Sequence, residues 1–74
     1  LVNVRVADKS KFKDNPAIEE AIGRAEDSLG GNGRVLVRPS GTEALIRVMA
    51  EGPEKEQLEE LVEQVAGVIR TELG

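Results

Sequence analysis

Residues 35–49 have the sequence VLVRPSGTEALIRVM, two apolar runs separated by a short polar segment. The runs Val35–Val37 and Leu45–Met49 are short, rich in Val, Ile and Leu, and bounded by turn residues, which predicts two strands. The polar segment between them is then the loop of a hairpin. The sequence therefore predicts a sheet at the centre of the fold.

This loop carries groups that suit the binding of a phosphate. The guanidinium of Arg38 is a rigid fork that fits two phosphate oxygens, and the hydroxyls of Ser40 and Thr42 are further donors. Gly41 permits a sharp turn and lets its N–H approach an anion without a side chain in between. Arg47 in the next strand either contacts the anion or supports the loop. Ordinary turns have the same composition, so the residues alone leave two interpretations open, an anion site and a plain turn.

The chain before the hairpin predicts one strand and one helix. Leu1–Val6 alternates apolar and polar residues, as a half-buried strand does, and Arg5 is expected on its solvent side. Asn15 and Pro16 are typical of a helix start, and Gly30 or Gly31 of a helix end. The expected buried positions of this helix are Ile18, Ala21, Ile22, Ala25 and Leu29.

The segment from Ala7 to Asp14 is polar and holds alternating lysines. Lys9, Lys11 and Lys13 form either a basic patch near a phosphate or a partner, or a solvated loop. In the second case Phe12, the only aromatic residue, covers an edge of the core.

A second helix is expected to begin at Pro53. Its apolar positions follow helical spacing, and glutamates cover its outer side. Gly67 lies outside this stripe, and the pattern does not explain it. The order of elements predicts an α+β fold, β-α-β-β-α, in which a small sheet carries both helices on one face. The apolar positions of this second helix are Leu58, Leu61, Val62, Val65, Ile69 and Leu73.

Composition limits the possible functions. The 74 residues are expected to form a single domain, and they contain no cysteine and no histidine, which argues against a complete active site and against a soft-metal site. The net charge is −4, yet the region around the loop is locally basic, which suits a small anion better than a nucleic acid. The motif Gly30-Gly31-Asn32-Gly33 fits the G-x-x-G of some RNA-binding loops, but the strand expected after it favours a simple turn. No apolar run is long enough for a membrane span or a signal segment, so a cytoplasmic protein is expected.

The hairpin resembles the phosphate-binding loop of the α-D-phosphohexomutase superfamily. The likeness rests on Arg38-Pro39-Ser40-Gly41-Thr42-Glu43 followed by Leu45-Ile46-Arg47-Val48, and it extends to both flanking regions. Ala44 departs from the proline usual in this family, which removes no phosphate donor. Gly41 favours the branch that acts on glucosamine phosphate over relatives that act on phosphomannose. A chain that begins at Leu1 without methionine is then expected to be the C-terminal domain of a larger enzyme.

The resemblance implies a fold like that of the TATA-box-binding protein and a role in phosphosugar binding. Enzymes of this kind interconvert glucosamine 6-phosphate and glucosamine 1-phosphate through a phosphoserine and a sugar bisphosphate. The phosphoserine and its Mg²⁺ belong to other domains, which would be this domain's partners, so the fragment itself would bind no cofactor and would not be catalytic. Arg38, Ser40, Gly41, Thr42 and Arg47 would bind the substrate phosphate. Alternatives are the corresponding domain of a phosphomannomutase or phosphoglucomutase, and a free-standing protein-interaction module.

Overall fold

The computed structural model describes residues 2–74 and contains three strands, two α-helices and one short 3₁₀ helix. This order confirms the predicted sequence of elements, except for the 3₁₀ helix, which lies where only a polar loop was expected. The elements are β1 (Val2–Arg5), η1 (Lys9–Phe12), α1 (Pro16–Leu29), β2 (Arg34–Pro39), β3 (Leu45–Glu51) and α2 (Lys55–Leu73).

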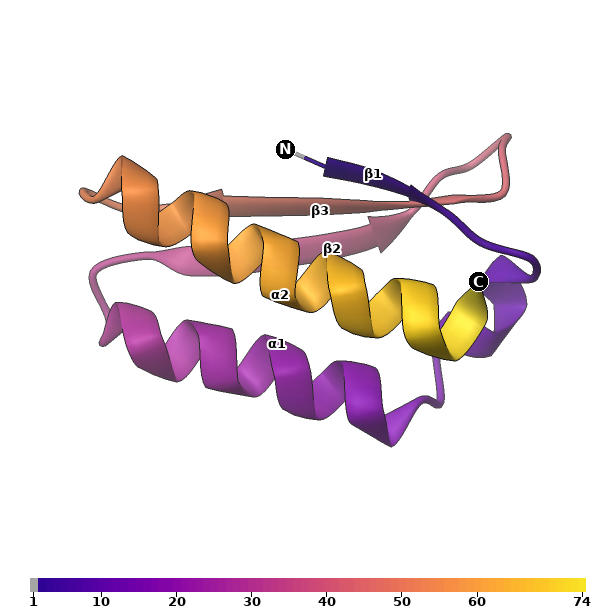
Figure 1. Ribbon diagram of the computed structural model, residues 1–74, viewed down its shortest axis with the longest axis horizontal. Coiled ribbons are helices and arrows are strands. Elements are labelled where there is room, and N and C mark those ends of the chain that lie inside the picture. The colour runs from indigo at the N-terminus through magenta and orange to yellow at the C-terminus, as the bar shows by residue number, and fades with distance from the viewer. Residues whose placement is uncertain (1) are drawn as a thin grey trace.

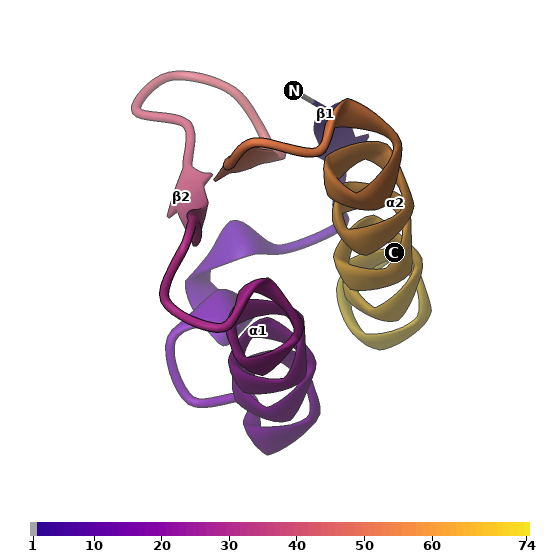
Figure 2. The ribbon, with the colours of Figure 1, turned by 90° about the vertical axis from the view of Figure 1, so that its left-hand side faces the viewer.

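The strands form one antiparallel sheet in the order β1-β3-β2. The predicted hairpin is therefore β2 and β3, and β1 pairs with the other edge of β3. Both helices pack on the same face of the sheet and run in opposite directions, as Figures 1 and 2 show from two sides. This arrangement confirms the predicted α+β class and leaves the second face of the sheet without a helix.

The core lies between the sheet and the two helices. Val4 of β1, Ile46 and Val48 of β3, and Ile69 of α2 are almost completely buried, as the alternation of the strands and the helical spacing require. Most residues expected in the two helical stripes are buried, while Ala21, Ile22 and Leu58 are partly buried against the core. Ala66 is fully buried but was not among the positions expected in α2.

The first strand is shorter than expected. Leu1 lies outside the described residues, and the strand ends at Arg5, although the side chain of Val6 remains buried. Arg5 is exposed, as predicted, and Phe12 is partly buried against the core.

The start of α1 follows the prediction, and that of α2 does not. The side chain of Asn15 accepts hydrogen bonds from the N–H groups of Ala17 and Ile18, and α1 ends at Gly30, whose φ of 58° is left-handed. In α2 the helix begins at Lys55 rather than at Pro53. Glu54 is still extended (φ −110°, ψ 101°) and acts as the N-cap, its carbonyl accepting the first helical bond.

One end of the molecule brings together segments that are distant in the sequence. The loop between β2 and β3, the 3₁₀ helix η1 and the C-terminal end of α2 all lie at this end (Figure 1). Two backbone hydrogen bonds join them, from Val6 N to Ala44 O at 3.0 Å and from Ala7 N to Leu73 O at 2.9 Å.

Candidate functional site

The candidate site is the β2–β3 loop, residues 40–44, together with the strand residues at its base. The N–H of Ser40 donates to the carbonyl of Leu45 at 2.8 Å and closes the loop. The hydroxyl oxygen of Ser40 accepts a long hydrogen bond, 3.4 Å, from the N–H of Glu43. Because that oxygen is used as an acceptor, the hydroxyl proton stays free to donate to a ligand.

Arg38 and Arg47 lie directly opposite each other at the base of the loop. The antiparallel register pairs Arg38 of β2 with Arg47 of β3, and Asn3 of β1 pairs with Arg47 on its other side. Opposed residues of an antiparallel sheet point to the same face, and both arginines are exposed on the face without helices. Like charges in this arrangement repel each other, so the pair creates a position where an anion is electrostatically favoured.

The two arginines are not neutralised by nearby carboxylates. The salt bridges among residues 2–74 are Arg24–Glu20, Arg34–Glu51 and Arg70–Glu63, and none includes Arg38 or Arg47. Arg34 offers a useful contrast, since it lies on the same strand and face but its Nε is 2.9 Å from a carboxylate oxygen of Glu51. The guanidinium groups of Arg38 and Arg47 are therefore available to a ligand.

Gly41 and Thr42 occupy the exposed tip of the loop. Gly41 does not have a positive φ, and a Cβ added to it would have no heavy atom within 4 Å. The loop therefore does not use the left-handed backbone that glycine permits. Any requirement for glycine here comes from the solvent side, where a ligand would approach.

Lys9 is a residue of this site whose role the sequence left open. Its Nζ donates to the carbonyl oxygens of Ser40, at 2.6 Å, and Glu43, at 3.1 Å. Lys11 and Lys13 are exposed, and among the hydrogen bonds of residues 2–74 only those of Lys9 join one of the three lysines to the loop. Its contact spans more than thirty positions along the chain, and the alternation of the lysines gave no indication of which one would make it.

Arg5 shares the open face with the two arginines of the site. It pairs with Leu45, which lies two positions before Arg47 along β3 and therefore on the same face. The sequence correctly placed its side chain outward, but only the register shows how close it lies to the loop. The end of the sheet around the loop thus carries four basic residues, Arg5, Lys9, Arg38 and Arg47, together with Glu43 and with Asp8 of the Lys9 segment.

The segment that carries Lys9 is fixed by Asp8. The carboxylate of Asp8 accepts hydrogen bonds from the hydroxyl of Ser10, at 2.5 Å, and from its N–H, at 2.9 Å. These bonds, and to a smaller extent the charge of Lys11, hold the pKa of the Asp8 carboxyl below its ordinary value. Asp8 is therefore ionised at neutral pH and caps η1.

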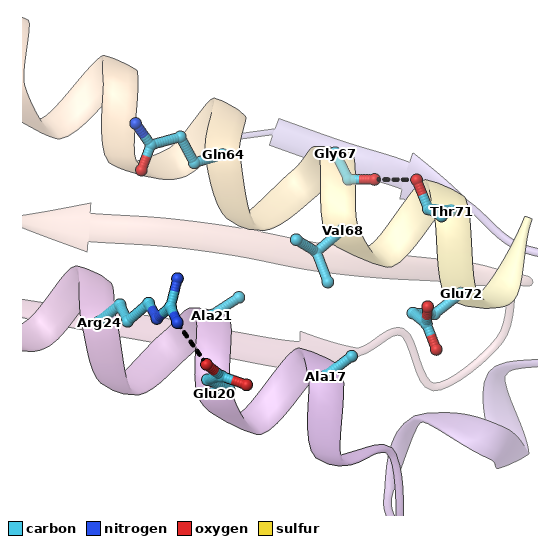
Figure 3. A pocket seen from close by; sticks show the side chains of 9 residues that line it. All are labelled: Ala17, Glu20, Ala21, Arg24, Gln64, Gly67, Val68, Thr71 and Glu72. Carbon is cyan, nitrogen blue, oxygen red and sulfur yellow. Dashed lines mark hydrogen bonds and ion pairs between the residues drawn. The ribbon is translucent and has the colours of Figure 1, made fainter.

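A separate groove of about 690 Å³ lies between α1 and α2. Small residues, Ala17, Ala21 and Gly67, form part of its lining, and an ion pair between Glu20 and Arg24 lies along one side (Figure 3). The carbonyl of Gly67 accepts a hydrogen bond from the hydroxyl of Thr71 at 3.0 Å. Two donors of its lining, Arg24 and Thr71, already bond Glu20 and Gly67, and the lining also includes the carboxylates of Glu20 and Glu72. The groove is therefore less suited to an anion than the loop.

The described part of the chain shows neither a metal-binding cluster nor a membrane-spanning helix. Residues 2–74 contain no group of three His, Cys, Asp or Glu side chains placed to hold a metal ion. Neither α-helix in this range has the length and apolar character required to cross a bilayer.

Comparison with known proteins identifies relatives over the whole chain. The family described as "Phosphoglucomutase/phosphomannomutase, C-terminal domain" matches residues 1–68. A phosphoglucosamine mutase from Brevibacillus brevis is 59% identical over 73 residues, 99% of this chain. The phosphoglucosamine mutases of Geobacillus thermodenitrificans and Listeria monocytogenes are 54% and 51% identical over all 74 residues. The chain spans 16% of the length of each of these relatives.

Proposed function

The chain belongs to the family of phosphoglucomutase and phosphomannomutase C-terminal domains, and we propose that it binds the substrate phosphate in a phosphoglucosamine mutase. In this proposal residues 1–74 are one domain of a longer enzyme that interconverts glucosamine 6-phosphate and glucosamine 1-phosphate. The choice among the sugars of the family follows the names of the three relatives described above, which are phosphoglucosamine mutases.

The observation that carries the proposal is the pair of arginines at the base of the loop. Arg38 and Arg47 are opposed in register, exposed and without carboxylate partners among residues 2–74. A phosphate bound between them would remove the repulsion and accept charge-assisted hydrogen bonds from both guanidinium groups. A plain turn would not require two opposed and unneutralised arginines.

Each loop residue has a defined part in this proposal. Arg38 is the bidentate ligand, and Arg47 contributes charge and further donors from the facing strand. Ser40 donates its free hydroxyl proton, Thr42 its hydroxyl, and Gly41 its backbone N–H. These groups would bind the phosphate that is not being transferred. Such binding orients the reacting end of the sugar, so that binding energy contributes to catalysis at a distant point.

The chemical steps take place outside this domain in the proposed enzyme. The family resemblance places a phosphoserine and a Mg²⁺ ion in other domains, and the reaction passes through a sugar bisphosphate. The acidic residues of the described chain do not form a group that fits a metal ion, so we derive no step through Mg²⁺ here. The exposed tip of the loop needs an opposing wall to exclude water, which the other domains would supply.

A titration followed by ¹H–¹⁵N correlation spectra tests this function. Glucosamine 6-phosphate is added to the 74-residue chain, with glucosamine as the control ligand. We expect the phosphorylated sugar alone to shift the resonances of residues 38–42 and of Arg47. Arg38→Ala should abolish these shifts, because it removes the guanidinium fork.

Arg34→Ala is the matched control, since it removes an arginine from the same strand and face that already pairs with Glu51. It should leave the titration unchanged. Equal shifts with glucosamine, or equal losses in the two arginine variants, would contradict a specific phosphate site.

A further inference from the structure

Lys9 lies behind the loop and bonds its backbone rather than a ligand. Its ammonium group donates to the carbonyls of Ser40 and Glu43, 2.6 Å and 3.1 Å away. Both bonds bring carbonyl dipoles of the loop toward the β1–α1 segment. The carbonyl of Ala44 faces the same segment, because it accepts from the N–H of Val6 at 3.0 Å.

These bonds also fix the direction of two N–H groups. In a trans peptide unit the C=O and the N–H point in opposite directions, and residues 2–74 contain no cis peptide bond. The carbonyl of Ser40 shares a peptide unit with the N–H of Gly41, and that of Glu43 with the N–H of Ala44. Both N–H groups therefore point away from Lys9, and no hydrogen bond among residues 2–74 uses them.

Lys9 is itself held in place at both ends of its segment. The N–H of Ala7 donates to the carbonyl of Leu73, and Asp8 caps the 3₁₀ helix that contains Lys9. The lysine is half-buried, whereas Lys11 and Lys13 are exposed. The segment from Val6 to Lys9 therefore connects the loop to the end of α2 and limits the movement of the ammonium group.

We propose that Lys9 is a positioning residue, which holds the N–H groups of Gly41 and Ala44 toward the bound phosphate. This inference rests on the proposed function of the loop, in which the N–H of Gly41 is already a donor, and adds the N–H of Ala44 and the residue that orients both groups. Orienting these donors before binding lowers the cost of ordering the loop around the anion. Lys9 does not itself contact the phosphate, because it lies on the carbonyl side of the peptide units.

The test uses inorganic phosphate with the 74-residue chain and three variants, again followed by amide chemical shifts. In the original sequence we expect phosphate to shift the amide resonances of Gly41 and Ala44. Lys9→Met should weaken binding about fivefold, as expected for loss of preorganisation, and should reduce the shifts of these two amides most. Lys9→Arg keeps the charge and the donors and should restore most of the affinity.

Lys13→Met is the matched control, because it removes an equal charge from the same segment without touching the loop. It should leave affinity and shifts unchanged. Equal losses in Lys9→Met and Lys13→Met would overturn the proposal in favour of a general charge effect. Unchanged binding in Lys9→Met, or an unfolded spectrum of that variant, would also overturn it. If phosphate moves no loop resonance in the original sequence, the proposed function itself fails, and the role of Lys9 with it.

Discussion

At the residue scale, the direct opposition of Arg38 and Arg47 lowers the stability of the folded chain. Directly opposed side chains in an antiparallel pair are about 5 Å apart at Cβ, and like charges there lower stability by roughly 0.2–1 kcal/mol. An ordinary surface position would be expected to avoid this arrangement or to neutralise it, as Glu51 does for Arg34. A ligand that binds only the folded chain would recover the lost stability.

Because of this repulsion, Arg47→Gln should change the stability of the chain in different ways without and with phosphate. Without phosphate, the variant should be more stable than the original chain by a few tenths to about 1 kcal/mol, because the repulsion is removed. With phosphate, it should gain less stability than the original chain, since one cationic ligand is missing. Thermal unfolding with and without inorganic phosphate measures both effects.

Arg34→Gln serves as the control for this prediction. It lies on the same face, but it breaks an exposed ion pair with Glu51, so the phosphate-free chain should gain no stability. A loss of stability in phosphate-free Arg47→Gln would contradict the proposed repulsion.

At the scale of the elements, local patterns were sufficient for most of the fold. The apolar runs around the loop and the Asn15-Pro16 start are signals within a few residues, and they predicted β2, β3 and the first turn of α1. The face of Arg5 followed from alternation, because side chains of a strand alternate between faces.

The parts that the sequence did not predict depend on contacts between distant residues. The alternation of a strand gives its faces but not its register, so the pairing of Arg38 with Arg47 could not be derived. The contact of Lys9 with the loop requires the fold to be known. The start of α2 was misplaced because Pro53 is compatible with both the first helical turn and the extended segment before it.

Gly67 in α2 gives a prediction at the same scale. A glycine inside a helix lowers stability by roughly 0.5–1 kcal/mol relative to alanine, and a Cβ at Gly67 would have no heavy atom within 4 Å. Gly67→Ala should therefore raise the free energy of unfolding by about that amount. Gly23→Ala in α1, where the surroundings are equally open, should give a similar gain in chemical denaturation.

Gly33→Ala provides the opposite control, since its Cβ would collide with the carbonyl of Glu51. It should destabilise the fold strongly. A loss of stability in Gly67→Ala alone would mean that the groove between the helices closes around this position in solution.

At the scale of the whole molecule, the β2–β3 loop lies outside the layers formed by the sheet and the two helices. Both helices cover one face of the sheet, and the loop projects from one end with its tip exposed (Figure 1). The donors of the site come from β2, β3 and the loop between them, supported by the segment before α1. In the proposed function these groups would form the phosphate ligand set, and the other domains of the longer enzyme would supply the opposing wall and the phosphoserine.

The proposed division of function between domains can be measured on the isolated chain and on a hybrid enzyme. The 74-residue chain alone should show no mutase turnover and should bind glucosamine 6-phosphate with a Kd of about 1 mM or weaker, near −4 kcal/mol.

A Brevibacillus brevis phosphoglucosamine mutase whose matching 73 residues are replaced by this chain should retain activity, because the relatives share more than half of these residues. In that hybrid, Arg38→Ala should lower kcat/KM by roughly 100-fold, whereas Arg34→Ala should leave it within about twofold, as for an exposed ion pair. The amide titration measures the Kd, and steady-state kinetics with glucosamine 6-phosphate measures turnover and kcat/KM. Turnover by the isolated chain would contradict the division of function between domains, and full activity of the Arg38→Ala hybrid would refute the assignment of phosphate binding to this loop.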